Sequence, residues 1–355
     1  MSSTRSRFTR SLALGLLCAL PMFNLTLGAP TLPRDVTSPK AAIAVKLNRK
    51  ASRARSLAGV EIVEELIRNA QAAFGHAKRD AQFDVLPLIA SLTPEKVVEM
   101  IQRTTELDPT YEPADFSSWF QVHFPQDNTI DDVGIAPAAQ GQLSGSSAPS
   151  AGNPPEAIMD AGNFLSPGDV MLLEMQTVDT SFNSWPIEIL DAEYEAIRLA
   201  VALRITVVEP AGNGGMNMDK PVLRDGDTTA RALLNRDSPD FRDSGAIMVG
   251  AGTAAVPRSR LGFSNYGSRA NGHAWGENIQ TTSVTMVKGR GRTGMVNANR
   301  GSKLTPTELR SLITVGGSAT SNLSSDLISV QPDLTAFVDG GHLQERVSED
   351  GSRPR

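Results

Sequence analysis

The sequence predicts an α/β protein with a central, mostly parallel β-sheet. Two short apolar segments, Val170–Met175 and Ile205–Val208, have the length and composition of buried strands. Between them, Asp191–Leu203 repeats apolar residues at helical spacing. A strand, a helix and a second strand at this spacing form a βαβ unit, which makes the two strands parallel and places helices on the faces of the sheet.

The start of the chain is typical of a secretory signal. An arginine-rich beginning is followed by an apolar stretch, Ser11–Leu27, and the small residues Gly28 and Ala29 offer a cleavage site. The alternative is an uncleaved membrane anchor, but the apolar stretch is short for a span. We therefore expect residues 1–29 to be removed and the mature chain to be secreted. The single cysteine, Cys18, would be lost with them, so no disulfide is expected.

Residues 30–125 are expected to form a small helical N-terminal region. It begins with a polar, basic segment, residues 30–55. Apolar residues at helical spacing from Val60 to Phe74 predict one helix. Thr93–Glu95 supplies an N-cap, a proline at the first helical position and an acid in the first turn, and Asp108–Pro109 ends this second helix.

The second half of the chain alternates between predicted strands, loops and one more helix. Gly141–Pro155 is rich in Ser, Gly, Ala and Pro and is expected to be a loop. Further strands are expected at Ala246–Ala251 and Thr282–Val287, with a loop at Gly262–Glu277 between them. The last predicted helix, Thr305–Leu312, begins with a good N-cap sequence.

Asn213 is the candidate functional residue that this pattern singles out. It lies at the tip of a glycine-rich loop, Ala211–Gly215, which directly follows the Ile205–Val208 strand. Glycine permits positive φ and close backbone approach. An amide at such a place can donate a hydrogen bond to an oxyanion that develops on an acyl carbon. The alternative is an ordinary turn, in which Asn tolerates the left-handed conformation.

Several segments, in the same order along the chain, resemble the subtilisin-like serine peptidases (subtilases). The resemblance covers roughly Val133 to Leu312, and its motifs are specific in combination but not singly. The similar segments are Val133–Ala138 (a G-[IV]-A-P element), Gly168–Gln176, Asp191–Gly215 with its A-G-N loop, Ser244–Ala251, Phe263–Gly267 (F-S-N-x-G) and His273–Glu277.

The resemblance implies a fold, an activity and a role for Asn213. The fold would have three layers around the parallel sheet, with residues 126–340 as a partial peptidase domain. Residues 30–125 would be a leader or propeptide-like region, and residues 341–355 a disordered tail. The implied activity is that of a serine endopeptidase, which cleaves protein or peptide substrates through an acyl-enzyme. Asn213 would be the oxyanion-hole donor.

The segments that should carry the catalytic Asp, His and Ser are not found. Subtilases order their triad Asp, His, Ser, and the first two motifs belong upstream of Gly134, where neither occurs. His76 and His123 lack the small-residue context of a catalytic histidine. The G-T-S-x-A-x-P segment should follow the Trp275 loop, and Ser318 lies too far along the chain to replace its serine.

Two classes of function remain open. The first is a secreted subtilisin-like peptidase by descent, active or not, which is either a degenerate relative or a sequence from a gene model or transcript that lacks the catalytic segments. The second is a secreted, non-catalytic binding protein on a degenerate subtilase scaffold. Without a base, a serine is a poor nucleophile. We therefore expect the catalytic machinery of this chain to be incomplete.

The remaining classes of ligand are not expected. A formal G-x-G-x-x-G at Gly289–Gly294 is followed by Gly301 and Pro306, which interrupt the helix that a dinucleotide site needs. The acids between Asp127 and Asp132 lack a glycine-centred calcium loop. A net charge of -5 gives no electrostatic reason to bind nucleic acid. We therefore expect no cofactor, no metal, no nucleic acid and, after removal of the signal, no membrane contact.

Overall fold

The computed structural model describes residues 41–47, 56–73, 83–124, 143–148, 153–224, 227–278 and 304–332. The expected signal segment and cleavage site, the Val133–Ala138 element, the Thr282–Val287 strand, His76 and the 341–355 tail lie outside the described residues.

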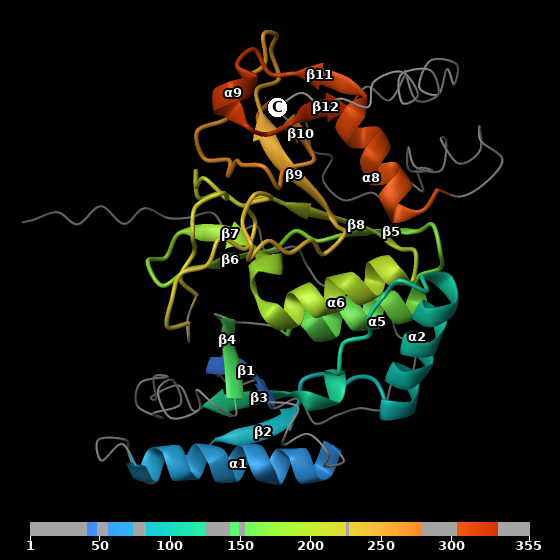
Figure 1. Ribbon diagram of the computed structural model, residues 1–355, viewed down its shortest axis with the longest axis vertical. Coiled ribbons are helices and arrows are strands. Elements are labelled where there is room, and N and C mark those ends of the chain that lie inside the picture. The colour runs from blue at the N-terminus through green and yellow to red at the C-terminus, as the bar shows by residue number, and fades with distance from the viewer. Residues whose placement is uncertain are drawn as a thin grey trace, which may run out of the picture. The chain divides into compact units, whose positions relative to one another are not determined.

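A four-stranded parallel sheet forms the centre of the described fold (Figure 1). Its strands are β5 (Val170–Leu172), β8 (Thr206–Pro210), β9 (Ile247–Gly252) and β10 (Gly272–Trp275), in the order β10-β9-β8-β5. Helix α6 (Asp191–Ala202) lies in the chain between β5 and β8. The predicted α/β class, the three adjacent parallel strands and their crossover helix are therefore confirmed.

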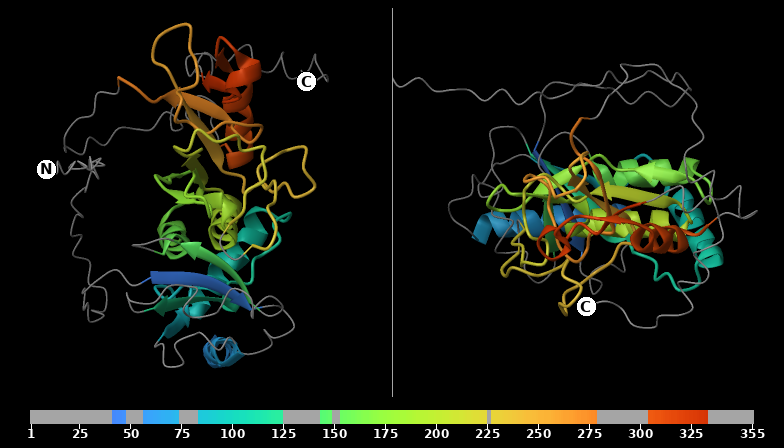
Figure 2. Two further views of the ribbon diagram at one scale, coloured as in Figure 1. Left: turned by 90° about the vertical axis from the view of Figure 1, so that its left-hand side faces the viewer. Right: turned by 90° about the horizontal axis from the view of Figure 1, so that it is seen from above.

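Helices pack on both faces of this sheet. On one face, α6 and α5 (Pro154–Phe164) lie side by side (Figures 1 and 2) and share a core with Met171 and Val207. On the other face, α8 (Pro306–Val315) packs against Val208 and Val249. Neighbouring residues such as Val207 and Val208 contact helices on opposite faces, because successive side chains of a strand point to opposite faces of the sheet.

Local sequence determines where these helices begin. The Thr305 hydroxyl accepts a hydrogen bond from the Glu308 amide, and the Glu308 carboxylate reaches back to the Thr305 amide, so α8 begins with a capping box. The Asn153 side chain caps α5 by accepting a hydrogen bond from the Glu156 amide. Helix α5 and strand β4 (Leu143–Ala148) overlap Gly141–Pro155, which was expected to be a loop, and that expectation is wrong at those residues.

The N-terminal part of the described chain contains a second, antiparallel sheet. Its order is β2-β3-β1-β4, with β1 at Ala41–Leu47, β2 at Asp84–Pro87 and β3 at Trp119–Phe124. Helix α1 (Ser56–Ala73) packs on it through Val63 and Ile67. Both predicted helices are present, the second as α2 (Pro94–Leu107), but the expectation of a purely helical region missed the sheet.

Shorter elements surround the two sheets. A hairpin of β6 (Gln176–Val178) and β7 (Ser184–Pro186) leads through the 3-10 turn η2 (Ile187–Ile189) into α6. Another 3-10 turn, η1 (Phe116–Ser118), precedes β3. The C-terminal described elements are β11 (Gly317–Ala319), α9 (Leu323–Asp326) and β12 (Val330–Pro332). The expected Gly262–Glu277 loop contains β10, so it is a loop only in part.

Candidate functional site

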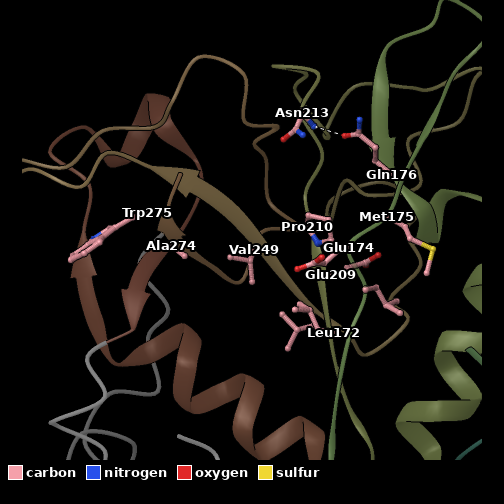
Figure 3. Close-up of a pocket in the computed structure, with 12 residues that line it drawn as sticks. Leu172, Glu174, Met175, Gln176, Glu209, Pro210, Asn213, Val249, Ala274 and Trp275 are labelled. Atoms are coloured by element: carbon pink, nitrogen blue, oxygen red, sulfur yellow. Dashed lines mark hydrogen bonds between the residues drawn. The ribbon is translucent and has the colours of Figure 1, made fainter. Parts of the chain in front are cut away.

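A pocket of about 630 Å³ is lined by all four parallel strands, at the carboxyl ends of β5, β8 and β10 and at the middle of β9 (Figure 3). This is the end of the sheet at which α/β folds place their ligands. Most of its walls are apolar. The residues that line it are Leu172, Leu173, Glu174, Met175, Gln176, Val208, Glu209, Pro210, Asn213, Val249, Ala274 and Trp275.

Asn213 lies at the edge of this pocket, on the loop after β8, as the sequence predicted. Its backbone amide donates a hydrogen bond to the Gln176 Oε1, with 2.9 Å between the two atoms (Figure 3). The residue is exposed, and its side-chain amide has no partner within the described ranges. The amide is therefore available to donate to a ligand.

Asn265 shapes the loop that presents Asn213. Its Oδ1 accepts hydrogen bonds from the amides of Gly214 and Met216, at 3.1 and 2.8 Å. Its Nδ2 donates to the carbonyls of Ser184 and Ala211, both at 2.8 Å. Because Asn265 is fully buried, these bonds fix the loop against β7.

Gly212 makes that close packing possible. Its φ is +102°, and a Cβ there would lie 2.7 Å from the Asn265 amide nitrogen. Only glycine accepts both conditions without strain. In the sequence, Asn265 is recognisable only as part of the F-S-N-x-G turn, and nothing near it indicates this positioning role.

The two outer strands give the pocket different ends. On β10, Trp275 is 46% exposed, and its indole nitrogen donates to the Gln331 Oε1 at 3.1 Å. Two residues beyond the end of β5, Glu174 presents an exposed carboxylate that has no ion-pair or hydrogen-bond partner in the described part of the chain. No Lys, Arg or His is among the residues that line the pocket.

The structure does not bring the remaining catalytic candidates to Asn213. His273 on β10 is 1% exposed, and its Nδ1 lies 3.3 Å from the Ser329 carbonyl oxygen rather than near a hydroxyl. Burial lowers the pKa of His273 below its ordinary value. His123 belongs to the antiparallel sheet, where its Nε2 lies 2.9 Å from the Gln121 Oε1. Ser318 is exposed on β11, opposite Gln331 of β12.

A buried ionic cluster lies beside the inner strands of the pocket. Arg269 and Glu188, both with fully buried side chains, pair through two hydrogen bonds of 2.7 and 2.9 Å. The Ser244 hydroxyl also donates to Glu188. Glu209 of β8 is fully buried, and neither of its carboxyl oxygens has a hydrogen-bond partner in the described structure.

Burial is the main reason why the pKa of Glu209 is raised well above its ordinary value, and the charge of Glu188 raises it further. The carboxyl group of Glu209 is fully buried, so Glu174 is the exposed acidic side chain among the lining residues.

Within the described ranges, no three His, Cys, Asp or Glu side chains are grouped to hold a metal ion. No helix among those residues has the length and hydrophobicity needed to span a bilayer.

No protein-family model and no curated protein matches the chain.

Proposed function

We propose that this protein is a secreted relative of the subtilisin-like serine peptidases that binds polypeptide in the Asn213 pocket without hydrolysing it. One observation supports this most strongly. A loop fixed by Asn265 presents a free amide at an apolar pocket that four parallel strands line, in a sequence that lacks the peptidase motifs for base and nucleophile. Binding and chemistry use different groups, so a substrate groove can persist when the triad is absent.

An active serine endopeptidase is the second candidate, and the presence of Asn213 favours it. In an intact peptidase, removing the oxyanion donor lowers turnover by about 100- to 1000-fold, a magnitude known from subtilisin itself. The two candidates share an extracellular location and a protein or peptide ligand. They differ in whether a serine is activated.

Labelling with a fluorophosphonate probe separates the two candidates, because the probe reacts with activated serines. We expect no covalent label on the purified chain and only background cleavage of a generic peptide substrate. Asn213→Ala should leave that background unchanged, as should the control Asn322→Ala on the exposed turn before α9.

Cleavage by the wild type that falls at least about tenfold in Asn213→Ala would contradict the non-catalytic function. His273, His123 and Ser318 would then be the first residues to test for a triad.

Export is tested separately by sequencing the N-terminus of protein collected from culture medium. Cleavage after the small residues Gly28 and Ala29 should make the mature chain begin near Pro30. Secreted material that retains Met1 would contradict this part of the proposal.

A further inference from the structure

The width of the pocket is determined by the order of the strands. Trp275 comes from β10 and Glu174 lies two residues beyond the end of β5, and these are the two outer strands of the four. Figure 3 shows Trp275 and Glu174 on different sides of Val249. Neighbouring strands lie about 4.8 Å apart, so three spacings separate the two ends by about 14 Å across the sheet. The strand register places Trp275 about three residues, or about 10 Å, further along the sheet than Glu174, so the two ends are about 17 Å apart. An extended polypeptide covers about 3.4 Å per residue, so about five residues span this distance.

The two ends of the pocket fit different side chains. The exposed indole ring of Trp275 is held by Gln331 and offers an aromatic surface for a large apolar side chain. At the other end, the Glu174 carboxylate is unpaired within the described structure, which favours a Lys or Arg side chain. Leu172, 61% exposed, provides apolar surface on β5 for the aliphatic part of such a side chain.

The centre of the pocket favours small or apolar residues. Val208, Pro210 and Val249 line it with uncharged side chains, and Glu209 between them on β8 is fully buried. A ligand that crosses the pocket therefore meets an aromatic end, an apolar middle and an acidic end.

We propose that the pocket selects an extended polypeptide segment in which a large apolar residue and a Lys or Arg are separated by about five positions. The apolar residue packs on Trp275 and the basic residue pairs with Glu174. This selectivity rests on the proposed polypeptide-binding function.

A set of dye-labelled eight-residue peptides tests this selectivity by fluorescence polarisation. The reference peptide places Phe and Lys five positions apart in a Gly/Ala background, in both sequence orders. The comparison peptides replace Lys with Gln, replace Phe with Ala, or place Phe and Lys next to each other.

An exposed ion pair contributes about 0.2–1 kcal/mol. In the sequence order that binds more tightly, the reference peptide should therefore bind about 1.4- to 5-fold more tightly than its Gln counterpart. The peptide in which Phe and Lys are next to each other should bind no more tightly than the Gln peptide.

Two variants assign the preference to the named residues. Glu174→Gln should abolish the difference between the Lys and Gln peptides, whereas the control Glu106→Gln, exposed on α2, should preserve it. Trp275→Ala should weaken the binding of the peptides that contain Phe and leave the affinity for the peptide with Ala in place of Phe unchanged.

The outcomes also separate this inference from the proposed function. Peptides that bind with equal affinity whatever their charge or spacing, in wild type and Glu174→Gln alike, would overturn the selectivity and leave polypeptide binding intact. If no peptide binds at all, both proposals are wrong.

Discussion

Arg269→Met should strongly destabilise the protein, because it leaves buried acceptors without their donor. The guanidinium group is 0% exposed and pairs with Glu188 at 2.7 and 2.9 Å. It also donates to the Asn271 Oδ1 at 2.8 Å and to the Ala246 carbonyl at 3.1 Å. Breaking a buried pair by removing one partner costs about 3–5 kcal/mol, since the remaining charge is uncompensated. We expect a loss of this size in the free energy of unfolding.

Urea denaturation followed by far-ultraviolet circular dichroism measures this loss. The matched control is Arg231→Met. Arg231 is 38% exposed and lies 3.5 Å from Asp227, so its loss should cost less than about 1 kcal/mol. The double variant Glu188→Met/Arg269→Met removes both charges and should recover much of the stability. An Arg269→Met protein within about 1 kcal/mol of the wild type would refute this reasoning.

Three further changes test individual elements. Burial raises the pKa of Glu193 from 4.5 to about 7, so the stability that it contributes is fully present below pH 4.5 and is lost as the pH rises through 7. Glu193→Gln should reduce the fall of the melting temperature between pH 4.5 and about 7. An unchanged pH profile would contradict the role of Glu193. Thr305→Ala should lower the free energy of unfolding, measured by urea denaturation, by about 1 kcal/mol because the α8 cap is lost. The control Thr307→Ala in the same helix should lower it by less than about 0.5 kcal/mol. Phe182 is 85% exposed with a φ of 62°, so Phe182→Gly should raise the free energy of unfolding by about 0.5–1 kcal/mol, and a decrease would count against strain at this position.

The parallel sheet could be predicted because its signals are local. The apolar runs that became β5, β8 and β9, and the periodicity of α6, are each visible within about a dozen residues. The same is true of the Thr305 cap of α8.

The antiparallel sheet could not be predicted, because its strands come from distant segments. Strand β1 pairs with β3 and β4, so Val45 lies opposite Phe120 and Gly145. The sequence of β4, Leu-Ser-Gly-Ser-Ser-Ala, has the composition of a loop. Pairing with β1 overrides that local preference.

The candidate site was predictable only at Asn213. A strand followed by a glycine loop can be recognised from the sequence, and the structure places that loop at the pocket. The positioning role of Asn265 depends on contacts with residues about 50 and 80 positions away. Trp275 and Glu174 become the two ends of one pocket only through the strand order β10-β9-β8-β5.

Native mass spectrometry of the protein mixed with the Phe–Lys reference peptide tests the central proposal most directly, because one spectrum reports both binding and cleavage. The account predicts a complex whose mass equals the protein plus the intact peptide, and no peptide fragments after prolonged incubation. Fragments of the peptide, or a covalent acyl-protein species, would contradict binding without hydrolysis. A spectrum with no complex under conditions that preserve weak binding would contradict the pocket as a polypeptide site.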